Sequence, residues 1–169
     1  YIETPDFNII ITNTQINNNY AKYDGGAIYS IYGPESLIGN ITIINSQINN
    51  NKLISNDNSG DNTCIIVGDM FTTIKNSNIT NNQASDTLIG DVTLLENSLI
   101  KNNKAKQITY NWAGGTITHS TFQNNTASET IICSRWGQGS GLSKLAYCNF
   151  IGNKGYLVTE KGYSTELII

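Results

Sequence analysis

A seven-residue phrase that recurs six times constrains the fold of this chain more than any other feature. It reads Asn-[Ser/Thr]-x-Φ-x-Asn-Asn, where Φ is Ile or Phe; the fifth and sixth copies begin with His119 and Tyr147, and the sixth is degenerate. The Φ residues are separated by 32, 31, 21, 22 and 28 residues, and they are Ile16, Ile48, Ile79, Ile100, Phe122 and Phe150. An internal repeat of about 20 to 50 residues is typical of a solenoid, in which each unit packs only against its neighbours.

Short apolar segments on both sides of the phrase have the residue pattern of β-strands. These segments are rich in β-branched residues, and in several of them apolar and polar residues alternate with period two. Those before the phrase are 41–44, 71–74, 92–95 and 116–118; those after it are 27–28, 65–67, 88–89, 131–133 and 157–158. No segment keeps a helical period over ten residues. We therefore predict an all-β fold, a right-handed parallel β-helix of about six coils with three short strands each. We expect residues 1–169 to form a single β-helix domain or a segment of a longer β-helix.

The unequal spacings predict where loops interrupt the coils. The 21- and 22-residue spacings correspond to the bare coil, and the longer ones imply surface insertions at about 29–39, 52–63 and 134–144. The third insertion is rich in glycine and contains Arg135 and Trp136.

Asparagine occupies one fixed position in every copy, three residues after Φ. The chain contains 25 Asn, but abundance alone does not explain a fixed frame. Successive coils lie about 4.8 Å apart, so identical side chains stack, and an amide can donate to one neighbour and accept from the other. Asn also tolerates the left-handed backbone of tight turns. We predict an inward, hydrogen-bonded ladder of Asn19, Asn51, Asn82, Asn103, Asn125 and Asn153.

Two short motifs resemble those of a known family. Gly-Gly-small-Ile occurs at 25–28 and 114–117, and Phe-x-x-Asn occurs at 122–125 and 150–153. These resemble the paired GGAI and FxxN repeats of the chlamydial polymorphic outer-membrane-protein (Pmp) family, which are similar to repeats in surface proteins of protists such as ciliates. Four coils here carry Ile where that family has Phe. The resemblance implies a β-helix in a cell-surface or extracellular setting.

Composition argues against several functions. The net charge is -3 and the ten Lys and Arg residues are scattered, so no basic patch favours nucleic acid. No apolar run approaches the roughly 18 residues that span a bilayer. Many β-helices cleave polysaccharides, but His119 has no glycine neighbours and Arg135 is the only arginine, so we predict no enzyme. There is no CxxC pair, which argues against zinc, while Cys64, Cys133 and Cys148 allow at most one disulfide, with free thiols as the alternative.

Asp69 and Asp91 are weak candidates for a Ca²⁺ site. Each follows a glycine, and the segments 67–69 and 89–91 align in adjacent coils. Stacked carboxylates would repel one another unless a cation with oxygen ligands bridged them. The alternative is that both Gly-Asp pairs simply turn a corner with solvated carboxylates, and we expect no cofactor on that interpretation.

Surface features indicate glycans and partners. Asn40, Asn78 and Asn124 begin N-glycosylation sequons, and Asn78 should point outward because the next residue, Ile79, points inward. Aromatic residues cluster near the predicted loops and either stack on sugars or cover the turns: Tyr20, Tyr23, Tyr29, Tyr32, Tyr110 and Trp112.

At both ends of the chain the sequence predicts strands and no capping element. Residues 8–11 enter the repeat directly, and 165–169 resemble one more strand, so the chain is expected to continue in a longer protein or to stack end to end with itself. The expected function is a non-enzymatic extracellular structural or surface protein, a glycosylated filament-forming subunit. The alternatives are a cell-surface adhesin that binds carbohydrate or protein, and a polysaccharide-degrading enzyme.

Overall fold

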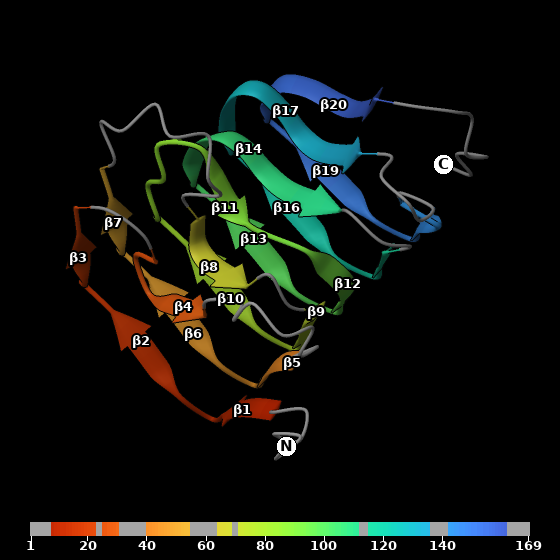
Figure 1. Ribbon diagram of the computed structural model, residues 1–169. Helices are drawn as coiled ribbons and strands as arrows, with labels where there is room; N and C mark the ends of the chain where they lie inside the picture. Colours follow the sequence, from red (N-terminus) through yellow and green to blue (C-terminus); the bar gives the residue numbers. More distant parts are fainter. Residues whose placement is uncertain are drawn as a thin grey trace, which may run out of the picture.

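The computed structural model describes residues 8–22, 25–30, 40–54, 64–68, 71–111, 115–135 and 142–161, and they form a parallel β-helix (Figure 1). Three six-stranded sheets stack along it. Sheet A contains β1 (Asn8–Thr12), β5 (Asn40–Ile44), β9 (Phe71–Lys75), β12 (Val92–Glu96), β15 (Thr116–Thr118) and β18 (Lys144–Ala146). Sheet B contains β2 (Gln15–Asn17), β6 (Gln47–Asn49), β10 (Asn78–Thr80), β13 (Leu99–Lys101), β16 (Thr121–Gln123) and β19 (Asn149–Ile151).

Sheet C completes each coil. It contains β4 (Ile28–Ser30), β8 (Cys64–Gly68), β11 (Thr87–Ile89), β14 (Lys104–Asn111), β17 (Thr126–Arg135) and β20 (Lys154–Lys161). The short strands β3 (Tyr20–Ala21) and β7 (Lys52–Leu53) pair with each other in the first two coils, where the later coils have the first residues of β14, β17 and β20. Every pairing in the described part of the chain is parallel, and that part contains no helix.

The register of sheet B confirms the repeat found in the sequence. The six Φ residues lie opposite one another in successive strands, from Ile16 opposite Ile48 to Phe122 opposite Phe150. One copy of the phrase therefore equals one coil, whatever the length of the loops between copies. Side chains alternate between the two faces of a strand, and this row lies on the face that points into the core. Its members Ile48, Ile79, Ile100 and Phe122 are fully buried.

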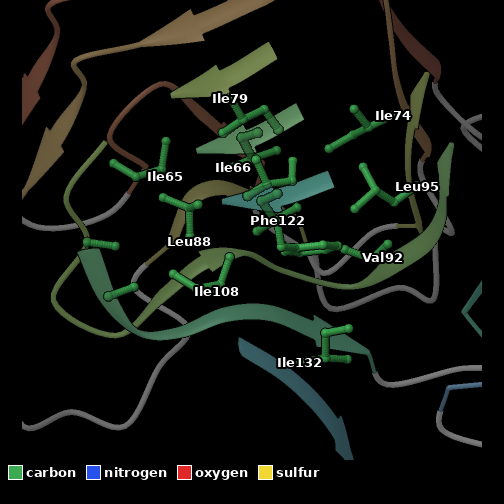
Figure 2. Packing of buried hydrophobic residues seen from close by; sticks show 14 of the residues in the cluster. Ile65, Ile66, Ile74, Ile79, Leu88, Val92, Leu95, Ile108, Phe122 and Ile132 are labelled. Carbon is green, nitrogen blue, oxygen red and sulfur yellow. The ribbon is translucent and has the colours of Figure 1, made fainter. Parts of the chain in front are cut away.

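The core consists of columns of apolar side chains that run along the solenoid. Figure 2 shows Ile65, Leu88 and Ile108 of sheet C on one side of the interior, and Ile74 and Leu95 of sheet A on the other. The rings of Phe122 and Phe150 are stacked, with centroids 5.0 Å apart. Burial of such columns is the main source of stability that a solenoid has.

Left-handed residues form both corners of sheet B. The first residue of each phrase has a positive φ: Asn13, Asn45, Asn76, Asn97, His119 and Tyr147. All six residues that precede a ladder Asn have one as well: Asn18, Asn50, Asn81, Asn102, Asn124 and Gly152. We expected this conformation at the ladder position itself, and that was wrong. The turn requirement and the ladder requirement fall on adjacent asparagines, which explains why the phrase ends in two.

The predicted insertions were too wide. Tyr29 belongs to β4, Lys52 to β7, and Ser134 and Arg135 to β17, which pairs with β20. The interiors of these loops and the strand expected at 165–169 lie outside the described residues. The strand β14 was missed, because its charged first half conceals the apolar residues that follow.

The two Gly-Gly-small-Ile motifs are not equivalent. Ile28 lies in β4 of sheet C, whereas Ile117 lies in β15 of sheet A. Both Phe-x-x-Asn motifs do lie in sheet B and in register. Within the described ranges, no helix is long and apolar enough to cross a membrane.

Candidate functional site

The asparagine ladder predicted from the sequence is present and runs through all six coils. The Nδ2 group of Asn82 donates to Oδ1 of Asn103 at 3.1 Å, and the same oxygen accepts the backbone N–H of Asn82 at 2.9 Å. The pattern repeats at every step from Asn19 to Asn153. The four middle members, Asn51, Asn82, Asn103 and Asn125, are buried.

Each ladder amide also closes the adjacent turn. The second Nδ2 proton of Asn103 is donated to the backbone carbonyl of Ile79 at 2.9 Å, and Asn82 and Asn125 donate in the same way to Ile48 and Ile100. An interior member therefore accepts two hydrogen bonds and donates two. No other side chain of this size supplies two donors and a two-fold acceptor at one place, so the position is restricted to Asn.

A second ladder runs beside the first, at the Ser/Thr position of the phrase. The backbone N–H of Ser77 donates to Oγ of Ser98 at 3.1 Å, and that hydroxyl donates to the carbonyl of Glu96 at 2.8 Å. Equivalent bonds join Thr14, Ser46, Ser77, Ser98 and Ser120. Sequence reasoning recorded this position but assigned it no role, although its conservation of hydroxyl type among the copies was a usable signal.

Cys148 occupies the serine place in the last described coil. Its thiol lies 3.3 Å from the carbonyl of Ala146, and it is not in a disulfide. Burial raises the pKa of the Cys148 thiol, against the smaller effect of its hydrogen bonds with the backbone of Ser120 and Ala146. The thiol is therefore a structural member of the row and a poor nucleophile at neutral pH. Cys133 is buried, and the side chain of Cys64 lies outside the description.

Both ladders have a direction. In each, the backbone N–H points toward the following coil and the side-chain oxygen toward the preceding one. Within the described part of the chain, nothing donates to Oδ1 of Asn19, and the backbone N–H of Asn153 has no acceptor. The first and last described coils thus present opposite and complementary hydrogen-bonding groups. The half-buried Ile16 and Phe150 lie beside these groups, at the two ends of the apolar row.

The three sequon asparagines have different surroundings. Asn78 is exposed on the outer face of β10, as predicted from the inward direction of Ile79. Asn124 is exposed and left-handed at a corner of sheet B, whereas Nδ2 of Asn40 donates to Asn8 at 2.9 Å. All three lie on the lateral surface and not at the ends of the solenoid.

The alignment that suggested a Ca²⁺ site differs from the strand register by one residue. Ile89 pairs with Ile66 and not with Val67. Asp69 lies outside the described residues, so the Ca²⁺ site at Asp69 and Asp91 stays a prediction. Among the residues that are described, no group of three His, Cys, Asp or Glu side chains could hold a metal.

The remaining candidates are dispersed. His119 stacks on Tyr147, with ring centroids 4.9 Å apart, and its Nδ1 lies 2.9 Å from Oγ1 of Thr118. Tyr20 is exposed and Tyr110 is half-buried. The side chains of Tyr29 and Arg135 and the whole of Tyr23, Tyr32, Trp112 and Trp136 are not described. The two candidates whose side chains are described, Tyr20 in β3 and Tyr110 in β14, lie in different coils.

An ion-pair network crosses three coils on the outer face of sheet C. The Nζ of Lys106 lies 3.4 Å from Asp86 and 3.6 Å from Glu129, and Glu129 also accepts from Gln107 at 3.3 Å. The Asp86 carboxylate above all, and then that of Glu129, raises the pKa of Lys106, although burial acts in the opposite direction.

The network predicts a small stabilisation that is lost at high pH. Because the folded-state pKa of Lys106 lies above its unfolded value, the contribution is complete below about pH 10.4 and disappears as pH rises through the raised pKa. The side chain is 45% exposed, so Lys106→Met should lower the free energy of unfolding at pH 7 by no more than about 1 kcal/mol. The unfolding free energies of the two proteins, measured in urea, should converge once the pH exceeds the raised pKa of Lys106; a constant difference at all pH values would contradict the electrostatic origin.

Comparison with known proteins identifies no relative. No family model, no curated protein and no solved structure matches the chain. The resemblance to Pmp-like repeats therefore stays a prediction from its motifs.

Proposed function

We propose that this chain is a non-enzymatic structural segment of an extracellular or cell-surface protein, and that it associates end to end with a second copy of itself. The observation that carries the proposal is the direction of the ladders. The first described coil offers Oδ1 of Asn19 as an acceptor, and the last offers the N–H groups of Asn153 as donors. A second copy placed one coil spacing beyond β19 brings these groups together.

The joint would reproduce an ordinary step within the solenoid. Nδ2 of Asn153 already donates to the carbonyl of Phe122, as interior members donate to the preceding coil, so its second proton is the one required at the joint. Phe150 would pack over Ile16, extending the apolar row and removing two half-buried side chains from water. Such head-to-tail contact does not close on itself and generates a filament.

Sedimentation and electron microscopy of the concentrated protein test this proposal. Filaments with an axial repeat of about six coils at ~4.8 Å, near ~29 Å, are expected. Asn153→Asp keeps the shape and the acceptor for Asn125 and loses the donor to the carbonyl of Phe122. At the joint it would also set a carboxylate against Oδ1 of Asn19. This should raise the critical concentration at least about tenfold, since an unpaired charge buried at an interface costs several kcal/mol.

Asn149→Asp is the matched control. It adds the same charge four residues earlier, on the exposed outer face of β19, and should change assembly by less than about twofold. Equal effects of the two variants, or a monomer that never associates, would reject end-to-end association.

Glycosylation is the second part of the proposal. The exposure of Asn78 and Asn124 on the lateral surface supports modification without obstruction of the joint. Mass spectrometry of the chain secreted from eukaryotic cells should find N-glycan at one or more of Asn40, Asn78 and Asn124. A secreted chain without glycan would remove this part of the proposal and leave the ladder argument intact.

A further inference from the structure

Three lysines lie in one row along the outer face of sheet C. The paired residues of the row, in coil order, are Tyr20, Lys52, Gln83, Lys104, Thr126 and Lys154. The residues that follow them point inward, since Leu53, Ala84, Ala105 and Ala127 are buried. Lys52, Lys104 and Lys154 are exposed and occupy every second coil. We call these six residues the lysine row.

The cations of the lysine row are not neutralised by described neighbours. Asp86 and Glu129 lie nearby on sheet C, but both pair with Lys106. The other ion pair of the described residues joins Lys75 to Glu96 on sheet A. The row is therefore a line of positive charge on a protein whose net charge is -3. At physiological ionic strength, charges more than about 8 Å away are largely screened, so a partner at the row is affected mainly by these lysines.

The spacing of the lysines along the row indicates which kind of partner can bind there. Two coil spacings separate successive lysines by about 9.6 Å, which is comparable to the length of one disaccharide in an extended polysaccharide. Phosphates of a nucleic-acid strand follow one another at about 3.4 Å along the axis of B-DNA, and most of them would miss the lysines. A rigid β-helix cannot adjust this period, because it is set by the backbone hydrogen bonds between coils.

Neighbouring side chains suit a sugar polymer. The corner beside the row carries exposed asparagine amides, of which Asn102 donates to Asn81 at 3.2 Å along the solenoid. Amides of this kind donate to and accept from hydroxyl groups. Tyr20, 66% exposed, ends the row one coil before Lys52 and offers a ring face for stacking.

We propose that the lysine row binds a linear acidic polysaccharide that carries one anionic group per disaccharide. The polymer lies parallel to the solenoid axis, with its anions on Lys52, Lys104 and Lys154 and its hydroxyls over the flanking amides. The row is lateral, so this activity is independent of the end-to-end joint and goes beyond the structural role.

Binding to immobilised hyaluronan at low salt tests the proposal, because that polymer has one carboxylate per disaccharide. Neutral dextran and oligo(dT) are the comparison ligands. The triple variant Lys52→Gln, Lys104→Gln, Lys154→Gln should weaken hyaluronan binding about tenfold, since each exposed charge pair contributes a few-fold. Its control, Lys75→Gln, Lys101→Gln, Lys144→Gln, removes the same charge from sheets A and B, leaves the ion pairs of Lys106 intact and should weaken binding less than about threefold.

A further variant separates spacing from charge. Lys104→Gln combined with Gln83→Lys keeps three lysines in the row but makes their spacing unequal, and binding should fall nearly as far as in the triple variant. Thermal melting checks that each variant is folded. Absence of hyaluronan binding, equal losses in the two triple variants, or tighter binding of oligo(dT) than of hyaluronan would each overturn the proposal.

Discussion

Replacement of Asn103 by alanine is expected to lower the free energy of unfolding by about 3–5 kcal/mol. The change removes the acceptor for the N–H and Nδ2 of Asn82, and the donor for the carbonyl of Ile79 and Oδ1 of Asn125. Each buried polar group left without a partner costs about 1–3 kcal/mol, and a water molecule in the vacated space would restore part of the loss. Chemical denaturation followed by circular dichroism measures the difference.

Asn78→Ala is the control for this experiment. It deletes the same amide from the preceding coil, but from the exposed outer face of β10, and should change the stability by no more than about 0.5 kcal/mol. A comparable loss in the two variants would mean that asparagine acts here through strand propensity and not through the ladder. Asn103→Asp distinguishes the ladder from strand propensity in a second way. It keeps the acceptors, loses both donors and buries a charge, and so should also destabilise strongly.

Phe122→Ala should destabilise the protein by a similar amount, about 3–5 kcal/mol, through a different mechanism. Phe122 is fully buried between Ile100 and Phe150, and its removal leaves a cavity that the rigid coils cannot close. The matched variant Phe150→Ala deletes the same ring from the last described coil, where the side chain is only half-buried, and should cost less than half as much. Equal costs would show that the last coil is covered as fully as the interior.

These two experiments test the two features that define the coil. A buried amide ladder restricts each coil to one register, because any other register leaves its groups unpaired. The apolar columns supply most of the favourable free energy but tolerate Ile or Phe at the same place, since hydrophobic burial has no direction. The strict Asn and the variable Φ of the phrase follow from this difference.

The sequence alone was sufficient for the repeat, the all-β fold and all six members of the ladder. Identical residues had to stack because a parallel β-helix places equivalent positions one strand spacing apart, and this holds whatever the loop lengths. The outward direction of Asn78 followed from alternation along a strand. These are local or periodic properties, which a single sequence contains.

Only the tertiary structure decided which residues meet where the coils are unequal. Loops of unequal length separate the segments that pair, and four features depended on that pairing. They are the register of the strand that precedes Asp91, the limits of the insertions, the different sheets of the two Gly-Gly motifs, and the alignment of Lys52 with Lys104. A shift of one residue reverses the face of a strand, and no sequence period determines that shift. The ladder was predictable because hydrogen bonding demands one residue type at one position, whereas a surface row such as the lysines is a product of register alone.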